Sequence, residues 1–263
     1  MKYAFSTLGC PGWSWKDVFS AAKDLGFAGV EIRGLGDIIY APDIPEFLPR
    51  NIEDTKKSLE RLSISIPVLT SGAVFAEAAR AQASYLEAAA YVNLASRLGV
   101  PYIRVMGTGE PGITEGDFAL GAKLYKHLCS YASEWGVTPL IETNGALSSS
   151  DKMLEFIDGN PNCGVLWDVH HTVRFGNESP EETAGKLGEY IKHVHVKDSV
   201  SAGDKIEYRM MGYGDIPVKA ALNALKSVRF DGFVSLEWVK RWNPDLQEPG
   251  IVFAHYASYI SSL

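Results

Sequence analysis

Cysteines, long apolar runs and excess positive charge are scarce or missing in this sequence of 263 residues, and each deficit excludes a class of protein. The only cysteines are Cys10, Cys129 and Cys163, which lack metal-type spacing, so we do not expect a disulfide framework. No run of about 18 apolar residues is present, which argues against a membrane span. Lys and Arg number 25 against 32 Asp and Glu, a formal net charge of −7. Nucleic acid and anionic membranes both favour a basic face, so neither is an expected partner.

The first residues, Met1-Lys-Tyr-Ala-Phe-Ser, run directly into a strand pattern and lack the apolar segment of a signal peptide. We therefore expect a cytoplasmic protein. Dimers are a frequent state of such proteins, and a homo-oligomer remains open.

Strand-like and helix-like segments alternate along the whole chain, without a break in composition. Helix starts carry a small hydroxyl residue followed by an acid, as in Ser14-Trp-Lys-Asp17, and several helices end at glycine, as at Gly26. The expected strands are 2–8, 28–33, 64–70, 102–106, 137–142, 163–168, 190–198 and 233–238, and the expected helices are 14–25, 52–62, 77–98, 114–136, one opening at 148–151, 180–187, 216–228 and 248–261.

Eight such units in this length predict a single (β/α)₈ TIM-barrel domain of the α/β class over residues 1–263. A doubly wound open sheet is the alternative. It is disfavoured because no Gly-x-Gly-x-x-Gly motif follows the first strand and because many strands end in a charged residue.

Ionisable side chains lie at the ends of four expected strands. Glu142, Asp168 and Glu237 end three of them, and His195 lies near the end of a fourth. Strands of such a barrel all end at one rim, so these four side chains are candidate ligands of one divalent metal ion. Their oxygen-rich composition suits Mn²⁺ or Mg²⁺, with Co²⁺ or Zn²⁺ tolerated. Taken singly, each acid could instead be a helix N-cap or a solvated strand end.

Three further side chains lie close to this expected rim. On an extended segment, His171 would lie just past the strand tip, where it could polarise the substrate or relay a proton; a surface histidine is the alternative. His193 and His195 are two residues apart and so share a strand face. Lys197 follows on the loop, where it could bind a substrate oxygen or pair with an acid.

These motifs together resemble the xylose isomerase-like barrel superfamily, which includes sugar epimerases, hydroxypyruvate isomerase, inosose dehydratase and abasic-site endonucleases. The segments that carry the resemblance are Glu142, Asp168-Val-His-His171, His195-Val-Lys-Asp198, Gly212-Tyr-Gly214 and Asp231-Gly-Phe-Val-Ser-Leu-Glu237. The resemblance implies that Glu142, Asp168, His195 and Glu237 bind the metal, that Glu142 and Glu237 form the acid/base pair, and that His171 contacts the substrate.

The chain also departs from this family pattern. Epimerase-like members carry an arginine soon after the metal-binding position of the seventh strand, and 200–205 has none, so Arg209 and Lys205 are candidates to replace it. The additional histidine ligands of the endonucleases are missing from Glu31-Ile-Arg33 and from Leu69-Thr-Ser-Gly72. A trinuclear DNA-cleaving site is therefore not expected.

Aromatic and glycine-rich loops complete the candidate site. Trp13 and Trp15 follow the first expected strand, and Trp242 follows the last, so they could form a wall against the apolar face of a sugar or could instead cap the core. Gly212-Tyr-Gly-Asp215 lacks the Lys and Ser/Thr of a P-loop and is interpreted as a turn.

The combined hypothesis is a sugar isomerase or epimerase that acts through a metal-stabilised enediolate, with Lys197, Arg209 and Trp13 as substrate-binding candidates. Two alternatives stay open: a dehydratase of a cyclic keto-polyol such as an inosose, which would share the first half-reaction, and a non-catalytic barrel that binds a polyol.

Overall fold

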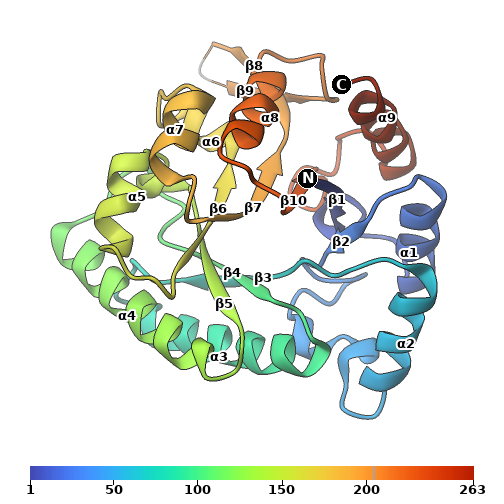
Figure 1. The fold of residues 1–263 in the computed structure, drawn as a ribbon, viewed down its shortest axis with the longest axis horizontal. Coiled ribbons are helices and arrows are strands. Elements are labelled where there is room, and N and C mark those ends of the chain that lie inside the picture. The colour runs from blue at the N-terminus through green and yellow to red at the C-terminus, as the bar shows by residue number, and fades with distance from the viewer. Residues whose placement is uncertain (204) are drawn as a thin grey trace.

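The computed structural model describes residues 1–203 and 205–263, and its centre is a closed barrel of parallel strands (Figure 1). The sheet order is β2-β1-β10-β7-β6-β5-β4-β3. Its two edge strands are joined by the bridges Gly29↔Ser65 and Ile32↔Leu69, which close the sheet. The predicted (β/α)₈ barrel is thereby confirmed. The barrel strands are β1 (Lys2–Ser6), β2 (Gly29–Glu31), β3 (Val68–Val74), β4 (Tyr102–Met106), β5 (Thr138–Glu142), β6 (Gly164–Asp168), β7 (Ile191–Val196) and β10 (Phe233–Leu236).

Helices surround this barrel in chain order, as Figure 1 shows. Several begin where a serine or threonine hydroxyl accepts a backbone N–H of the first turn, which satisfies a donor that the helix itself leaves unpaired. Ser14, Thr114, Ser149 and Ser179 play this part. The outer helices are α1 (Trp15–Asp24), α2 (Ile52–Leu62), α3 (Ala81–Leu98), α4 (Glu115–Ser133), α5 (Ser150–Ile157), α7 (Pro180–Leu187), α8 (Val218–Ser227) and α9 (Pro249–Ser261).

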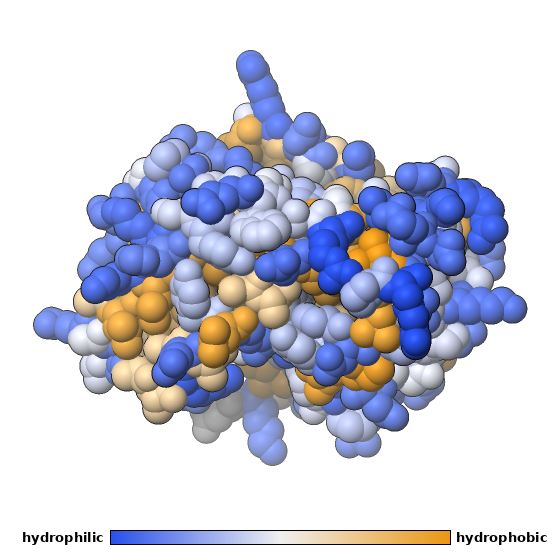
Figure 2. All heavy atoms as spheres, turned by 90° about the horizontal axis from the view of Figure 1, so that it is seen from below, coloured by the Kyte–Doolittle hydropathy of each residue, from blue (hydrophilic) through white to orange (hydrophobic). Residues whose placement is uncertain are grey.

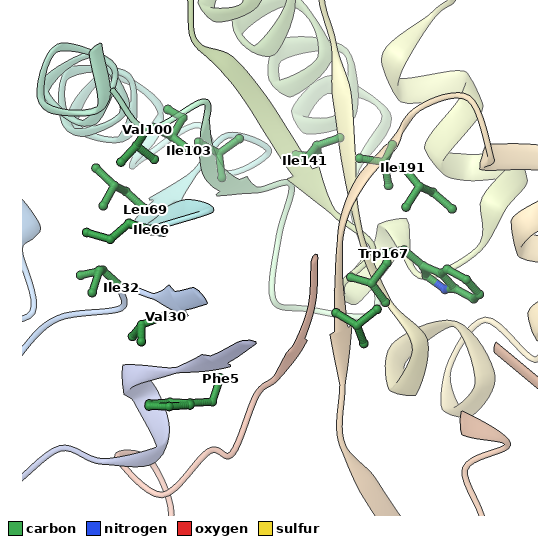
Figure 3. Close-up of a cluster of buried hydrophobic side chains, with 14 of the residues drawn as sticks. Phe5, Val30, Ile32, Ile66, Leu69, Val100, Ile103, Ile141, Trp167 and Ile191 are labelled. Atoms are coloured by element: carbon green, nitrogen blue, oxygen red, sulfur yellow. The ribbon is translucent and has the colours of Figure 1, made fainter. Parts of the chain in front are cut away.

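The strands alternate between an outward apolar face and an inward face. Outward residues pack under the helices in a core of fully buried side chains. Figure 3 labels buried side chains of this core from the strands and from the segments next to them: Phe5, Val30, Ile32, Ile66, Leu69, Val100, Ile103, Ile141, Trp167 and Ile191. This burial supplies the main driving force for folding, at roughly 25 cal/mol per Å² of apolar surface.

The inward face changes character along the barrel axis. Val68, Leu140 and Leu166 form a small separate apolar cluster inside it. Two residues further along β5 and β6 the same face carries Glu142 and Asp168, because side chains on one face recur every second residue. The apolar layer thus separates the polar end of the barrel interior from its other end.

Two elements depart from the expected pattern. The segment after β6 was expected to be extended, but Val169–Arg174 forms a short helix, α6. A hairpin of β8 (Asp198–Ala202) and β9 (Lys205–Arg209) follows β7. The third strand was also expected four residues early, at 64–70 rather than at Val68–Val74.

The glycine turn after β9 follows from one buried carboxylate. Asp198 accepts backbone N–H groups from Gly212, Gly214 and Ile216 at 2.8, 2.9 and 3.2 Å. A Cβ on Gly214 would lie 2.1 Å from the Asp198 carboxylate, so only glycine fits there. The turn predicted at 212–215 is therefore confirmed.

Among the described residues, no helix is both long and apolar enough to cross a bilayer. On the face shown in Figure 2, hydrophilic side chains predominate and apolar ones form separate patches.

Candidate metal centre and active site

Four ligand-type side chains meet at the carboxyl-terminal end of the barrel strands. Glu142 and Asp168 are the last residues of β5 and β6, His195 lies in β7, and Glu237 directly follows β10. One ligand atom from each lies within 4.8 Å of the other three, and all four residues are buried. The structure thus brings together the whole quartet that the sequence predicted as metal ligands.

The imidazole of His195 is oriented toward the three carboxylates. Its Nδ1 lies 3.7 Å from Glu142 Oε1, 3.9 Å from Asp168 Oδ2 and 3.5 Å from Glu237 Oε1. These distances are too long for hydrogen bonds, and this buried atom has no hydrogen-bond partner among the described residues. Separations of this size suit donor atoms that share one ion at about 2.0–2.2 Å. The four side chains therefore fit a divalent cation.

Glu31 binds the other nitrogen atom of the His195 imidazole, Nε2. His195 donates from Nε2 to Glu31 Oε2 at 2.8 Å, and His193 donates to the same oxygen at 3.0 Å. The Thr70 hydroxyl donates to Glu31 Oε1 at 3.0 Å. Because a carboxylate only accepts, Glu31 holds a proton of His195 on Nε2 and orients Nδ1 toward the quartet, where it can bind a metal ion once that nitrogen is deprotonated.

Sequence reasoning missed Glu31, although a signal for it was present. Glu31-Ile-Arg33 alternates charged and apolar residues in a strand, which predicts two charged side chains on the inward face. Burial by itself would raise the pKa of Glu31, but His195 and His193 hold that pKa well below 4.5. The pKa of His195 is conversely raised well above 6.5, because Glu31 and Glu237 outweigh the lowering effect of burial.

Two cationic side chains balance the acids. Lys197, fully buried at the end of β7, donates to Asp168 Oδ2 and to Glu237 Oε2. Arg104 Nε lies 3.1 Å from Glu142 Oε2. Burial raises the pKa of Glu142, but Arg104 and His195 together lower it to about 2. Of the two roles that the sequence left open for Lys197, the structure shows pairing with acids.

Asp168 acts in two ways at once. Its Oδ1 accepts the backbone N–H of His171 at 3.1 Å and so caps α6, while Oδ2 faces the quartet. The helix-cap interpretation of this acid is therefore confirmed, and its role as a metal ligand stays a prediction with which the position of Oδ2 agrees.

The capped helix turns one of its two histidines, His171, toward the rim. His171 Nε2 lies 3.9 Å from Asp168 Oδ2 and lines the cavity described next. His170 points elsewhere, since its Nε2 lies 2.9 Å from the Ser199 hydroxyl.

A cavity of about 330 Å³ opens onto the quartet. Glu142, Glu237, Lys197 and His171 line it, together with Arg33 and Arg104. Two larger clefts, of about 500 and 520 Å³, lie at the opposite end of the strands, near Pro67, Pro101 and Phe233. Active sites of such barrels lie at the carboxyl-terminal end, so the smaller cavity is the candidate active site.

Two predicted substrate-binding residues lie away from this cavity. Trp13 packs edge-to-face on Phe253, with ring centroids 5.7 Å apart, and Arg209 pairs with Glu207. Within the described part of the chain, neither residue lines the cavity, whereas Tyr208 and Trp242 do. Substrate binding by Trp13 and Arg209 stays a prediction, with no contact in its favour.

Solved structures share this fold over nearly the whole chain. The probable 3-DHS dehydratase AsbF of Bacillus anthracis matches with a TM-score of 0.83 and 17% identity, covering 99% of each chain. The 3-keto-D-glucoside 4-epimerase YcjR of E. coli matches with a TM-score of 0.79 and 15% identity over 100% of both chains. The IolI protein with a bound zinc atom matches with a TM-score of 0.79 and 19% identity, over 99% of this chain and 97% of that one.

Sequence comparisons reach a curated relative and a family. An uncharacterised protein of Methanocaldococcus jannaschii is 28% identical over 131 residues, which is 48% of this chain. The match spans 43% of that relative, less than half of its length. The family model for xylose isomerase-like TIM barrels matches residues 19–253. The chain therefore belongs to the xylose isomerase-like TIM-barrel family.

Proposed function

We propose that this protein is a metal-dependent isomerase or epimerase of a sugar. The observation that carries the proposal is the buried His195 Nδ1, without a hydrogen-bond partner among the described residues and facing three carboxylates beside a cavity. Glu142, Asp168, His195 and Glu237 would hold one divalent ion, with Mn²⁺ or Mg²⁺ preferred and Co²⁺ or Zn²⁺ tolerated. The structurally similar IolI protein binds a zinc atom, which supports a metal ion in a protein of this fold.

The ion would supply Lewis-acid chemistry, lowering the free energy of negative charge on a substrate carbonyl oxygen. The chain's own residues would move the proton. Glu142 and Glu237 both line the cavity. Glu142 forms an ion pair with Arg104, and Glu237 forms one with Lys197. One carboxylate would remove the proton next to the carbonyl, and the other would return it to the opposite face or to the adjacent carbon. His171 lines the same cavity and would hydrogen-bond a substrate oxygen.

The names of similar structures agree with this chemical class. YcjR is a 3-keto-D-glucoside 4-epimerase, and AsbF is a probable 3-DHS dehydratase. Removal of a proton beside a carbonyl would begin either reaction, so dehydration of a keto-polyol is one outcome of the test below.

The test is hydrogen exchange at carbon in deuterated water over a panel of sugars. We expect EDTA to abolish this exchange and Mn²⁺ to restore it. The Glu237→Gln substitution should lower the exchange rate about 100-fold or more. Glu155→Gln, an exposed carboxylate on α5 paired with Lys152, is the control and should leave exchange unchanged. A product that absorbs in the ultraviolet as an enone would assign the site to dehydration. Tight metal binding without exchange on any sugar would leave only a binding protein.

A further inference from the structure

Arg33 is the charged side chain of the cavity that the proposed reaction does not use. It follows β2 two residues after Glu31 and so shares the inward face. Its backbone N–H donates to the Thr7 hydroxyl at 2.9 Å, which fixes the chain at this point. Arg33 lines the cavity, as Glu142 and Lys197 also do.

Within residues 1–203 and 205–263, the guanidinium of Arg33 has no acceptor. Among the described residues, no hydrogen bond or ion pair to its nitrogens is present, and its Nη1 is buried with no partner. Burial is the main cause that lowers the pKa of Arg33, and the nearby Arg104 lowers it further. A buried donor without an acceptor costs free energy, the more so when it is charged. Such a group fits a ligand that brings the missing oxygen atoms.

The neighbours of Arg33 leave the guanidinium available to a ligand. Trp242 lies with its ring centroid 5.8 Å from the Arg33 Cζ, so an aromatic surface lies beside the charge. The nearby acid Glu87 raises the pKa of Arg33, but it forms no ion pair with Arg33 among the described residues and accepts the backbone N–H of Gly72 at 2.6 Å. Arg104 is already engaged by Glu142 and by the Ser71 carbonyl oxygen.

The charges around the cavity lead to the same conclusion. Arg33, Arg104 and Lys197 face Glu142, Asp168 and Glu237, so three positive side chains meet three negative ones. The divalent ion proposed above adds two positive charges. Even when Glu31 beneath His195 is included, the loaded site keeps a net charge of +1, which favours an anionic ligand.

We propose that the substrate carries an oxyanion group, a carboxylate or a phosphate ester, that binds to Arg33 while its carbonyl end lies at the quartet. A guanidinium presents parallel N–H donors in a planar fork that matches both groups. This inference rests on the proposed function and narrows its substrate class from sugars in general to sugar acids or sugar phosphates.

The test is calorimetric binding of anionic sugars and their neutral parents to the Mn²⁺-loaded protein. The probes are D-glucuronate, D-galacturonate, D-glucose 6-phosphate and D-fructose 6-phosphate, with glucose, galactose and fructose as the neutral set. We expect at least one anionic probe to bind about tenfold or more tightly than its parent, and Arg33→Gln to abolish that preference. Whether carboxylates or phosphates show the preference identifies the group.

Two variants separate binding from folding. Arg33→Lys keeps the charge but not the fork and should lose part of the preference, whereas Arg80→Gln removes an exposed guanidinium paired with Glu77 and should lose none. Mn²⁺ affinity should be unchanged in Arg33→Gln, which shows that the quartet is intact. The inference is overturned if no anionic probe is preferred by the unaltered protein, or if Arg33→Gln keeps the preference.

Failure of this inference differs from failure of the proposed function. Metal-dependent exchange at carbon without any effect of Arg33→Gln on anion preference would retain the isomerase and remove the anion site. Arg33-dependent binding of an anionic sugar without exchange on any sugar would retain the anion site and remove the isomerase.

Discussion

At the scale of single residues, Glu31 decides how His195 presents its nitrogen atoms. The carboxylate lies fully buried inside the barrel and accepts from His193, His195 and Thr70. A histidine that binds metal through one nitrogen and donates from the other to a carboxylate is held in one tautomer and one orientation. Glu31 touches none of the cavity and acts through His195, which makes it a positioning residue.

Replacing Glu31 should therefore weaken metal binding without removing a ligand. For Glu31→Gln we expect Mn²⁺ affinity about 10–100-fold lower, measured by calorimetry. Glu178→Gln is the matched control, because Glu178 is a partly buried carboxylate that likewise accepts several hydrogen bonds, from Ser150 and Thr183, and does not belong to the quartet. It should alter stability but not Mn²⁺ affinity. Equal affinity in Glu31→Gln and the unaltered protein would contradict the positioning role.

At the scale of elements, the sequence predicts regular units well and irregular ones poorly. The range of β4, Tyr102–Met106, agrees with the prediction, as do the ends of β5 at Glu142 and of β6 at Asp168. These strands are short apolar runs with a charged residue at or near the end, and that pattern carries most of the signal. The four predicted metal ligands meet because closing the barrel brings the ends of those strands together.

Elements that depend on a single tertiary contact could not be predicted. Val169–Arg174 contains β-branched residues and two histidines, a composition with weak helix propensity, and its helix begins because Asp168 caps it. At β3, Pro67 lies within the predicted strand, and Ser71-Gly72 resembles a loop although the strand continues through it to Val74. Glu31 ends a strand of only three residues and Arg33 follows that strand, so the alternation at 31–33 is a weak signal.

The double role of Asp168 gives a test at this scale. Asparagine caps helices about as well as aspartate but carries no charge, whereas alanine neither caps a helix nor carries a charge. In EDTA we expect Asp168→Ala to be less stable than Asp168→Asn by about 1 kcal/mol, measured by urea unfolding. Mn²⁺ affinity should fall strongly in both variants. Equal stability of the two variants would show that the cap does not hold α6, and retained Mn²⁺ affinity in Asp168→Asn would remove this residue from the metal site.

At the scale of the whole molecule, the buried ionisable groups set how stability depends on pH. Asp168 and Glu31 have lowered pKa values, as does Glu142, at about 2. Burial, with a smaller effect of Lys197, lowers the pKa of His170 to about 3. In all of these groups the unfolded chain takes up protons at a higher pH than the folded one.

Stability of the metal-free protein should therefore rise with pH across the acid range. The contribution of Glu142 is present above its ordinary pKa of 4.5 and is lost as pH falls toward about 2. The contribution of neutral His170 is present above 6.5 and is lost as pH falls toward about 3. His195 works in the opposite direction, because its raised pKa gives stability that is present below 6.5 and is lost at higher pH. The opposing signs place the maximum of stability near neutral pH rather than in acid.

Urea unfolding in EDTA between pH of about 3.5 and about 6.5 measures how the free energy of unfolding changes with pH. The slope of that dependence gives the difference in the number of protons bound by the unfolded and folded states. We expect the free energy of unfolding to increase by a few kcal/mol over that range. Glu142→Gln should flatten the lower part of the profile, because that side chain no longer titrates, whereas Glu155→Gln, exposed on α5, should leave the profile unchanged. A flat profile in the unaltered protein, or the same slope in Glu142→Gln, would mean that the buried carboxylates keep ordinary pKa values. The cluster would then be open to water, and the packed arrangement of acids, cations and imidazoles would not hold a metal ion tightly.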